Sequence, residues 1–157
     1  MSIPHDLLQP SLQGPAAARA PYSQTAGFAC AFFGGPPAAL LMAGLNAWRL
    51  GRWPRDLRWL LPALLLWIGF EAWLLRSESG LQVIDWIAIW FGRGASELMD
   101  RAFALACFAA TALLLHRREH RMADLMALPR PNGWVPGLLV IVAGNALSYG
   151  LLHVLLA

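Results

Sequence analysis

Ionisable side chains inside two apolar segments could bind protons or ions. Glu71 is the one carboxylate in the apolar run from Trp59 to Leu75, and it lies five residues before Arg76, about 7 Å at 1.5 Å per residue. His153 lies at a comparable depth in the last apolar run. A Glu71–His153 pair is therefore geometrically allowed, and intramembrane ionisable groups commonly serve as proton relays. The structural alternative is that Glu71 reaches the interface or hydrogen-bonds a neighbouring helix.

Polar side chains also occur in the last apolar run. Asn145, Ser148 and Tyr149 have the i, i+3, i+4 spacing that places side chains on one face of a helix. Interhelical hydrogen bonds, worth about 0.6–2 kcal/mol each, account for such a face, and a polar lining for a solute path is the functional alternative. Glu71, His153 and Asn145 are thus the candidate functional residues within the membrane.

Residues 116–120, His-Arg-Arg-Glu-His, match the H-x-x-E-H signature of a zinc protease family. The neighbouring Arg117, Arg118 and Arg121 would repel a divalent cation, and the only nearby third ligand is Asp124. We therefore expect no metal, no cofactor and no catalytic residues, and hence no enzyme. A membrane-bound metal hydrolase is the least favoured hypothesis.

A bundle of membrane helices must position these residues. The 157-residue chain is 58% hydrophobic and 13% charged, more apolar than a soluble domain of this length could bury. Continuous apolar runs near the length of a spanning helix favour helices over the alternating strands of a barrel. We predict an all-α integral membrane bundle of about four transmembrane helices plus a short interfacial or re-entrant helix. The predicted spans are residues 25–48, 59–75, 95–116 and 134–156, the short helix is 81–92, and 25–157 form one transmembrane domain.

The third of these spans is expected to begin in the outer interface. Ser96 is a good N-cap, and Glu97 and Asp100 would complement the positive start of a helix.

The distribution of arginine predicts how the bundle is oriented. Twelve Arg and no Lys, against nine Asp plus Glu, give a net charge of +3. Eight of these arginines lie in the two loops that connect the first span to the second and the third span to the fourth: Arg49, Arg52, Arg55, Arg58, Arg117, Arg118, Arg121 and Arg130. The positive-inside rule places both loops in the cytoplasm, so both termini would be periplasmic in a bacterial inner membrane. We expect the loops to attract anionic lipid headgroups, and we expect no nucleic-acid partner. Residues 1–24 are rich in proline and are predicted to form a disordered or extended outer tail.

Small residues recur every four positions in the first span and predict close helix packing. They are Gly27, Ala31, Gly35, Ala39 and Ala43. One small side chain per turn lets another helix approach closely, which is a main source of helix association in lipid. We expect a stripe of Ala102, Ala106 and Ala110 on the third span to receive it.

Pro36 and Pro37 follow Gly34 and Gly35 and interrupt the same span. A proline lacks the amide hydrogen and clashes with the preceding turn, so a kink near mid-membrane is expected. The kink is either a fixed bend or a hinge that exposes carbonyl groups to an ion or substrate, as in broken transporter helices.

Residues 32–39, FFGGPPAA, and 46–52, NAWRLGR, resemble a first-helix pattern of small bacterial multi-pass membrane proteins without a characterised activity. In that family an F-x-G-x-P element precedes an ending like N-x-W-x-L-G, and Pro37 departs from its usual aliphatic residue. The resemblance implies a membrane location and a helical fold, and it implies no function.

Two functions remain open from the sequence. The first is a non-catalytic accessory or structural membrane subunit that associates with itself or with another membrane protein. The alternative is a small oligomeric transporter that uses Glu71 as a proton or cation site and Pro36–Pro37 as its hinge.

Overall fold

The computed structural model describes residues 19–157, in which all regular secondary structure is helical. The elements are α1 (Gln24–Arg49), α2 (Trp53–Arg76), α3 (Glu78–Phe91), a 3₁₀ turn η2 (Gly92–Gly94), α4 (Ala95–Ala110), a π-helical turn η3 (Thr111–Leu115), α5 (Arg117–Leu125) and α6 (Trp134–Leu156). By residue count and apolar composition alone, four stretches are long enough to cross a membrane, namely α1, α2, α4 with η3, and α6. The predicted all-α membrane bundle is thereby confirmed.

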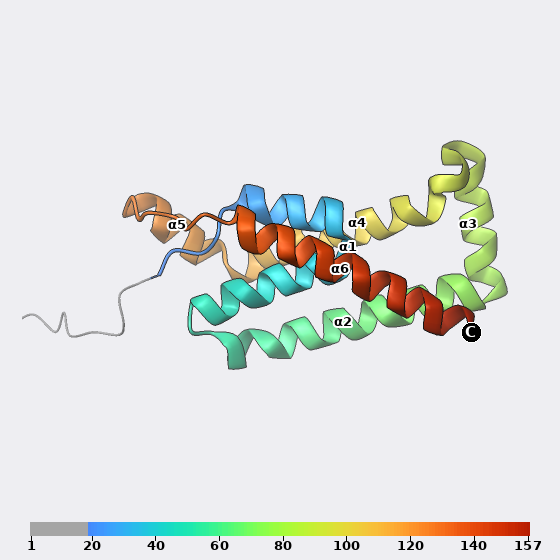
Figure 1. Cartoon of the computed structure of the whole chain (residues 1–157), viewed down its shortest axis with the longest axis horizontal. Coiled ribbons are helices and arrows are strands. Elements are labelled where there is room, and N and C mark those ends of the chain that lie inside the picture. Colours follow the sequence, from blue (N-terminus) through green and yellow to red (C-terminus); the bar gives the residue numbers. More distant parts are fainter. Residues whose placement is uncertain (1–18) are drawn as a thin grey trace, which may run out of the picture.

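Helices α2 and α3 refine the predicted boundaries. Helix α2 begins at Trp53 rather than at residue 59, because Pro54 is well tolerated in a first helical turn. Helix α3 lies crosswise at one end of the bundle and joins α2 to α4 (Figure 1). Its Trp86, Ile89 and Trp90 are exposed. This arrangement fits an interfacial helix better than a re-entrant one.

Helix α1 is folded back on itself. Gly35, with φ 70° and ψ −167°, separates a first arm, residues 24–34, from a second arm, residues 36–49. The amide of Tyr22 donates to Asn46 Oδ1 over 2.8 Å, although an unbroken helix of this length would separate its ends by about 39 Å. The Nε of Arg49 likewise donates to the carbonyl of Ala20 over 2.8 Å. Helix α1 is therefore a helical hairpin, and Figure 1 shows its two arms running in opposite directions.

The residues at the tip explain this reversal. A positive φ is accessible to glycine at little cost, so Gly35 can turn the backbone out of the helix. Pro36 and Pro37 have no amide hydrogens, so they cannot donate to the carbonyls of Phe32 and Phe33 and continue the helix. The helix breaks at the Gly-Gly-Pro-Pro element, as predicted. The break reverses the direction of the chain, however, and is not a kink within one span.

The two arms lie between α4 and α6. Ala31 of the first arm and Ala39 of the second form one buried cluster with Ala104 of α4. The predicted stripe is thus divided between two arms: Gly27 and Ala31 are on the first, Gly35 is at the turn, and Ala39 and Ala43 are on the second. The predicted partner stripe is wrong, since the expected alanines of α4, Ala102, Ala106 and Ala110, are exposed.

The hairpin tip and α6 approach each other closely. A Cβ atom built at Gly144 would lie 2.6 Å from the Cβ of Ala38 and 2.8 Å from the carbonyl oxygen of Gly34. Only glycine at position 144 therefore lets α6 approach the hairpin this closely. The periodic stripe in the first span did not indicate this second interface.

The described chain enters and leaves the bundle at opposite ends. Because both ends of α1 lie at one end, the chain then crosses the bundle three times, through α2, α4 with η3, and α6 (Figure 1). Arg19 lies at the end that carries α5, and Ala157 lies at the end that carries α3. The prediction that both termini share one side counted α1 as a crossing, whereas Arg19 and Ala157 lie at opposite ends of the bundle. The side of a membrane that each end faces stays a prediction. Residues 1–18 of the predicted tail lie outside the described residues.

Candidate functional site

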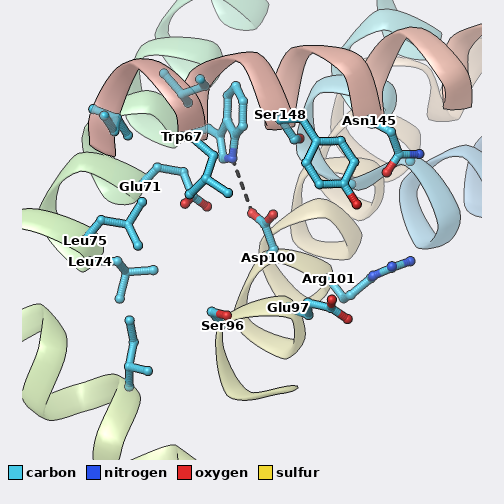
Figure 2. Close-up of a pocket in the computed structure, with 17 residues that line it drawn as sticks. Trp67, Glu71, Leu74, Leu75, Ser96, Glu97, Asp100, Arg101, Asn145 and Ser148 are labelled. Atoms are coloured by element: carbon cyan, nitrogen blue, oxygen red, sulfur yellow. Dashed lines mark hydrogen bonds between the residues drawn. The ribbon is translucent and has the colours of Figure 1, made fainter. Parts of the chain in front are cut away.

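The tip of the hairpin faces a cavity of about 280 Å³ inside the bundle. Three acidic residues line it: Glu71 from α2, and Glu97 and Asp100 from α4. Figure 2 shows the carboxyl groups of Glu71 and Asp100 approaching each other from their two helices. The indole Nε1 of Trp67 donates to Asp100 Oδ1 over 3.3 Å. A cavity of this size has room for several water molecules or a small solute.

Helical spacing brings these groups together. Trp67 and Glu71 are four residues apart and share one face of α2, while Glu97, Asp100 and Arg101 share one face of α4 at the i, i+3, i+4 spacing. Glu71 and Asp100 therefore face each other beside the cavity. Two carboxylates that face each other repel, so a shared proton or a bound cation would stabilise them.

The break in α1 also supplies backbone acceptors beside the cavity, which Gly34 and Gly35 help to line. The two prolines of the tip leave the carbonyl groups of Phe32 and Phe33 without helical donors. Arg101 of α4 donates to the carbonyl of Phe32, and Asn145 Nδ2 of α6 donates to that of Phe33 over 3.2 Å. Side chains from two neighbouring helices therefore cap the first arm and hold its tip at the cavity.

The structure brings together two of the three predicted functional residues. Glu71 and Asn145 line the same cavity, with Ser148 and Tyr149. His153 is exposed and is not among the lining residues, so the Glu71–His153 pair is not formed.

Glu71 instead faces Asp100, a residue whose position in the sequence predicts a role at the start of a helix. Helix α4 begins with Gly94 as its N-cap, not Ser96, so Asp100 lies more than one turn inside the helix. The spacing of Glu97, Asp100 and Arg101 was the available signal that these side chains share a face.

A second polar cluster lies at the opposite end of the bundle, and it is sealed. Asp56 of α2 is 1% exposed, and its Oδ2 lies 2.9 Å from Nε2 of His116. Arg52 lies 3.5 Å from the other oxygen of Asp56 and also pairs with Glu119. Two residues of the H-x-x-E-H motif are therefore bound to other side chains: His116 to Asp56, and Glu119 to Arg52. Across residues 19–157 no three His, Cys, Asp or Glu side chains are grouped so that they could hold a metal ion.

The other histidine of this motif is buried beside the cluster. Burial lowers the pKa of His120, and the positive charges of Arg130 and His116 lower it further, while Asp124 and Glu119 act in the opposite direction. Within residues 19–157 the Nδ1 atom of His120 has no hydrogen-bond partner. His120 is therefore neutral near pH 7 and packs as part of the structure.

No protein-family model, no curated protein and no solved structure matches this chain significantly. Fold and cavity define a multi-pass helical membrane protein with a folded-back first helix and an acidic interior cavity. The resemblance of residues 32–52 to small bacterial membrane proteins stays a prediction.

Proposed function

We propose that this chain is a small transport protein that binds a proton or a small cation in the cavity at the hairpin tip. One observation carries the proposal: the broken end of the first arm lines the same cavity as Glu71 and Asp100, whose carboxyl groups face each other. Broken helices that end near mid-membrane form ion and substrate sites in many transporters. Irregular backbone at that depth is tolerated where it is buried in protein or lines a cavity.

The charges of the lining favour a cationic ligand. Among the described side chains, three carboxyl groups line the cavity against one guanidinium, that of Arg101, and this guanidinium donates to the carbonyl of Phe32. Uncompensated negative charge is expensive in a membrane interior, so bound protons or a cation would stabilise the site. Trp67, Ser148 and Tyr149 add polar groups that could orient a hydrated ion or a small amine.

We further propose a bacterial inner membrane as the location, with the arginine-rich end facing the cytoplasm. That end carries the start and the end of α1, the start of α2, and α5. With α1 folded back, the described N-terminal residues would be cytoplasmic and Ala157 periplasmic. A reporter that requires export would then be active when fused after Ala157.

The accessory-subunit hypothesis makes a different prediction. Purification in lipid nanodiscs followed by mass spectrometry would recover a stoichiometric partner if the chain serves another protein. The transport proposal predicts that the chain is recovered alone or as a defined homo-oligomer.

Flux measurements on liposomes test the proposal. Purified protein would be reconstituted with an internal pH indicator and presented with protons, alkali cations and small amines. Glu71→Gln keeps the shape of the side chain and removes its charge, so we expect flux to be lost while the midpoint of thermal unfolding changes little. Glu78→Gln is the matched control, because Glu78 is exposed on α3 and does not line the cavity.

Two outcomes would overturn the transport proposal. One is wild-type flux in the Glu71→Gln protein, and the other is an absence of flux in the wild-type protein for every solute tested. Loss of flux in Glu78→Gln as well would show that the effect is not specific to the cavity.

A further inference from the structure

A recess of about 610 Å³ lies at the arginine-rich end of the bundle, away from the acidic cavity. Four arginines line it, Arg19, Arg49, Arg52 and Arg118, and the one acidic residue among the lining is Glu119. Glu119 already pairs with Arg52. The recess therefore carries a net charge of +3, from four positive and one negative side chains.

Two of the four arginines are already committed within the protein. Arg49 donates to the carbonyl of Ala20 and lies 5.4 Å from the ring centre of Tyr22, and Arg52 pairs with acidic side chains. Arg19 and Arg118 are exposed, and neither forms an ion pair with any side chain of residues 19–157. These two guanidinium groups are available to an anion.

The other wall of the recess is apolar and exposed. Trp48 is 73% exposed, and Met122 of α5 and Met126, which follows α5, are also exposed. Tryptophan is enriched at the membrane–water interface, where its ring lies at the level of the lipid headgroups. The recess also lies where α1 ends and α2 begins, and in the proposed orientation these helix ends lie at the level of the lipid headgroups.

We propose that this recess binds a phospholipid with an anionic headgroup. The phosphate would lie among the arginines, with Arg19 and Arg118 as its free partners, and the acyl chains would follow the apolar wall formed by Trp48 and the methionines. Arginine presents a planar fork of donors that suits phosphate oxygens. A free phosphate would use the arginines alone, whereas a phospholipid uses both walls.

Lipid retention measured by native mass spectrometry tests this site. Delipidated protein would be titrated with phosphatidylglycerol or phosphatidylcholine in detergent. We expect phosphatidylglycerol to bind preferentially, and Arg118→Gln or Arg19→Gln to weaken it about fivefold each, which corresponds to about 1 kcal/mol per arginine near an anionic surface. Arg117→Gln is the matched control, because Arg117 is an exposed neighbour on α5 that does not line the recess.

Three results would overturn the proposal. Equal binding of the two lipids would show that the headgroup charge is not recognised. An equal loss in Arg117→Gln and Arg118→Gln would show diffuse attraction rather than a site. Displacement of phosphatidylglycerol by inorganic phosphate at equal concentration would show that the apolar wall contributes nothing.

Discussion

The two polar regions of this protein contain similar residue types and differ in how they are paired. At the arginine-rich end, Asp56 is buried against His116 and Arg52, and the small space beside the cluster is about 20 Å³. At the hairpin tip, Glu71 and Asp100 face a cavity of about 280 Å³ with few compensating charges. Buried charges that are fully paired hold a structure together, while charges that face a cavity without full compensation are available to a ligand.

Replacement of the central carboxylate in each region would test this contrast most strongly. Asp56→Ala leaves the buried His116 without its partner and removes one of the two acidic partners of Arg52, so we expect the free energy of unfolding to fall by about 3 kcal/mol. Glu71→Ala should cost about 1 kcal/mol or less, because it removes one of two carboxyl groups that repel each other. Tryptophan fluorescence during thermal unfolding would measure both. Equal losses would contradict the contrast.

A smaller effect is expected where the hairpin tip meets α6. Gly144→Ala introduces a methyl group 2.6 Å from the Cβ of Ala38, so we expect a loss of about 1–3 kcal/mol and a displaced tip. Gly150→Ala in the same helix is the control, since a Cβ there meets no atom within 4 Å. If the two variants unfold at the same temperature, the close approach of α6 to the tip is not present in the membrane.

The smallest expected effect is a pH dependence at the arginine-rich end. Burial lowers the pKa of His120 below its ordinary value of 6.5, so the unfolded chain takes up this proton more readily than the folded chain. Stability should therefore be constant above about pH 6.5 and fall as the pH decreases below it. Thermal unfolding measured from pH 8 to pH 5 would show this.

Two histidine variants assign that pH dependence. His120→Gln should reduce the fall in stability at low pH, whereas His153→Gln, at an exposed position of α6, should leave it unchanged. An unchanged profile in His120→Gln would assign the effect to another group of the cluster.

The sequence predicted the helices well and their arrangement less well. Length and apolar composition were sufficient to place four long helices, and the Gly-Gly-Pro-Pro element placed the break in the first. The direction of the chain after Gly35 could not be predicted, because a kinked span and a hairpin have the same local pattern. The difference depends on distant contacts, such as that between Tyr22 and Asn46. The same contacts decide that Arg19 and Ala157 lie at opposite ends of the bundle.

The candidate site was predicted in part. Glu71 was found because a carboxylate within an apolar run is conspicuous, and Asn145 because its helix face carries further polar groups. Asp100 was missed because acidic residues near a helix start have an ordinary electrostatic explanation. Asp100 faces Glu71 only because α2 packs against α4, and this packing is visible in the structure alone.

The hairpin in α1 is the central claim, because it brings the broken helix end to the acidic cavity. The most direct test is the distance between two spin labels, at Gln24→Cys and Trp48→Cys, both exposed positions, with Cys30 and Cys107 replaced by alanine. In a hairpin the labels lie on neighbouring arms, whose axes should be about 8–10 Å apart, as in packed helices. In a single spanning helix they would be about 36 Å apart. A short distance in lipid nanodiscs is the predicted result, and a distance near that of the continuous helix would contradict it.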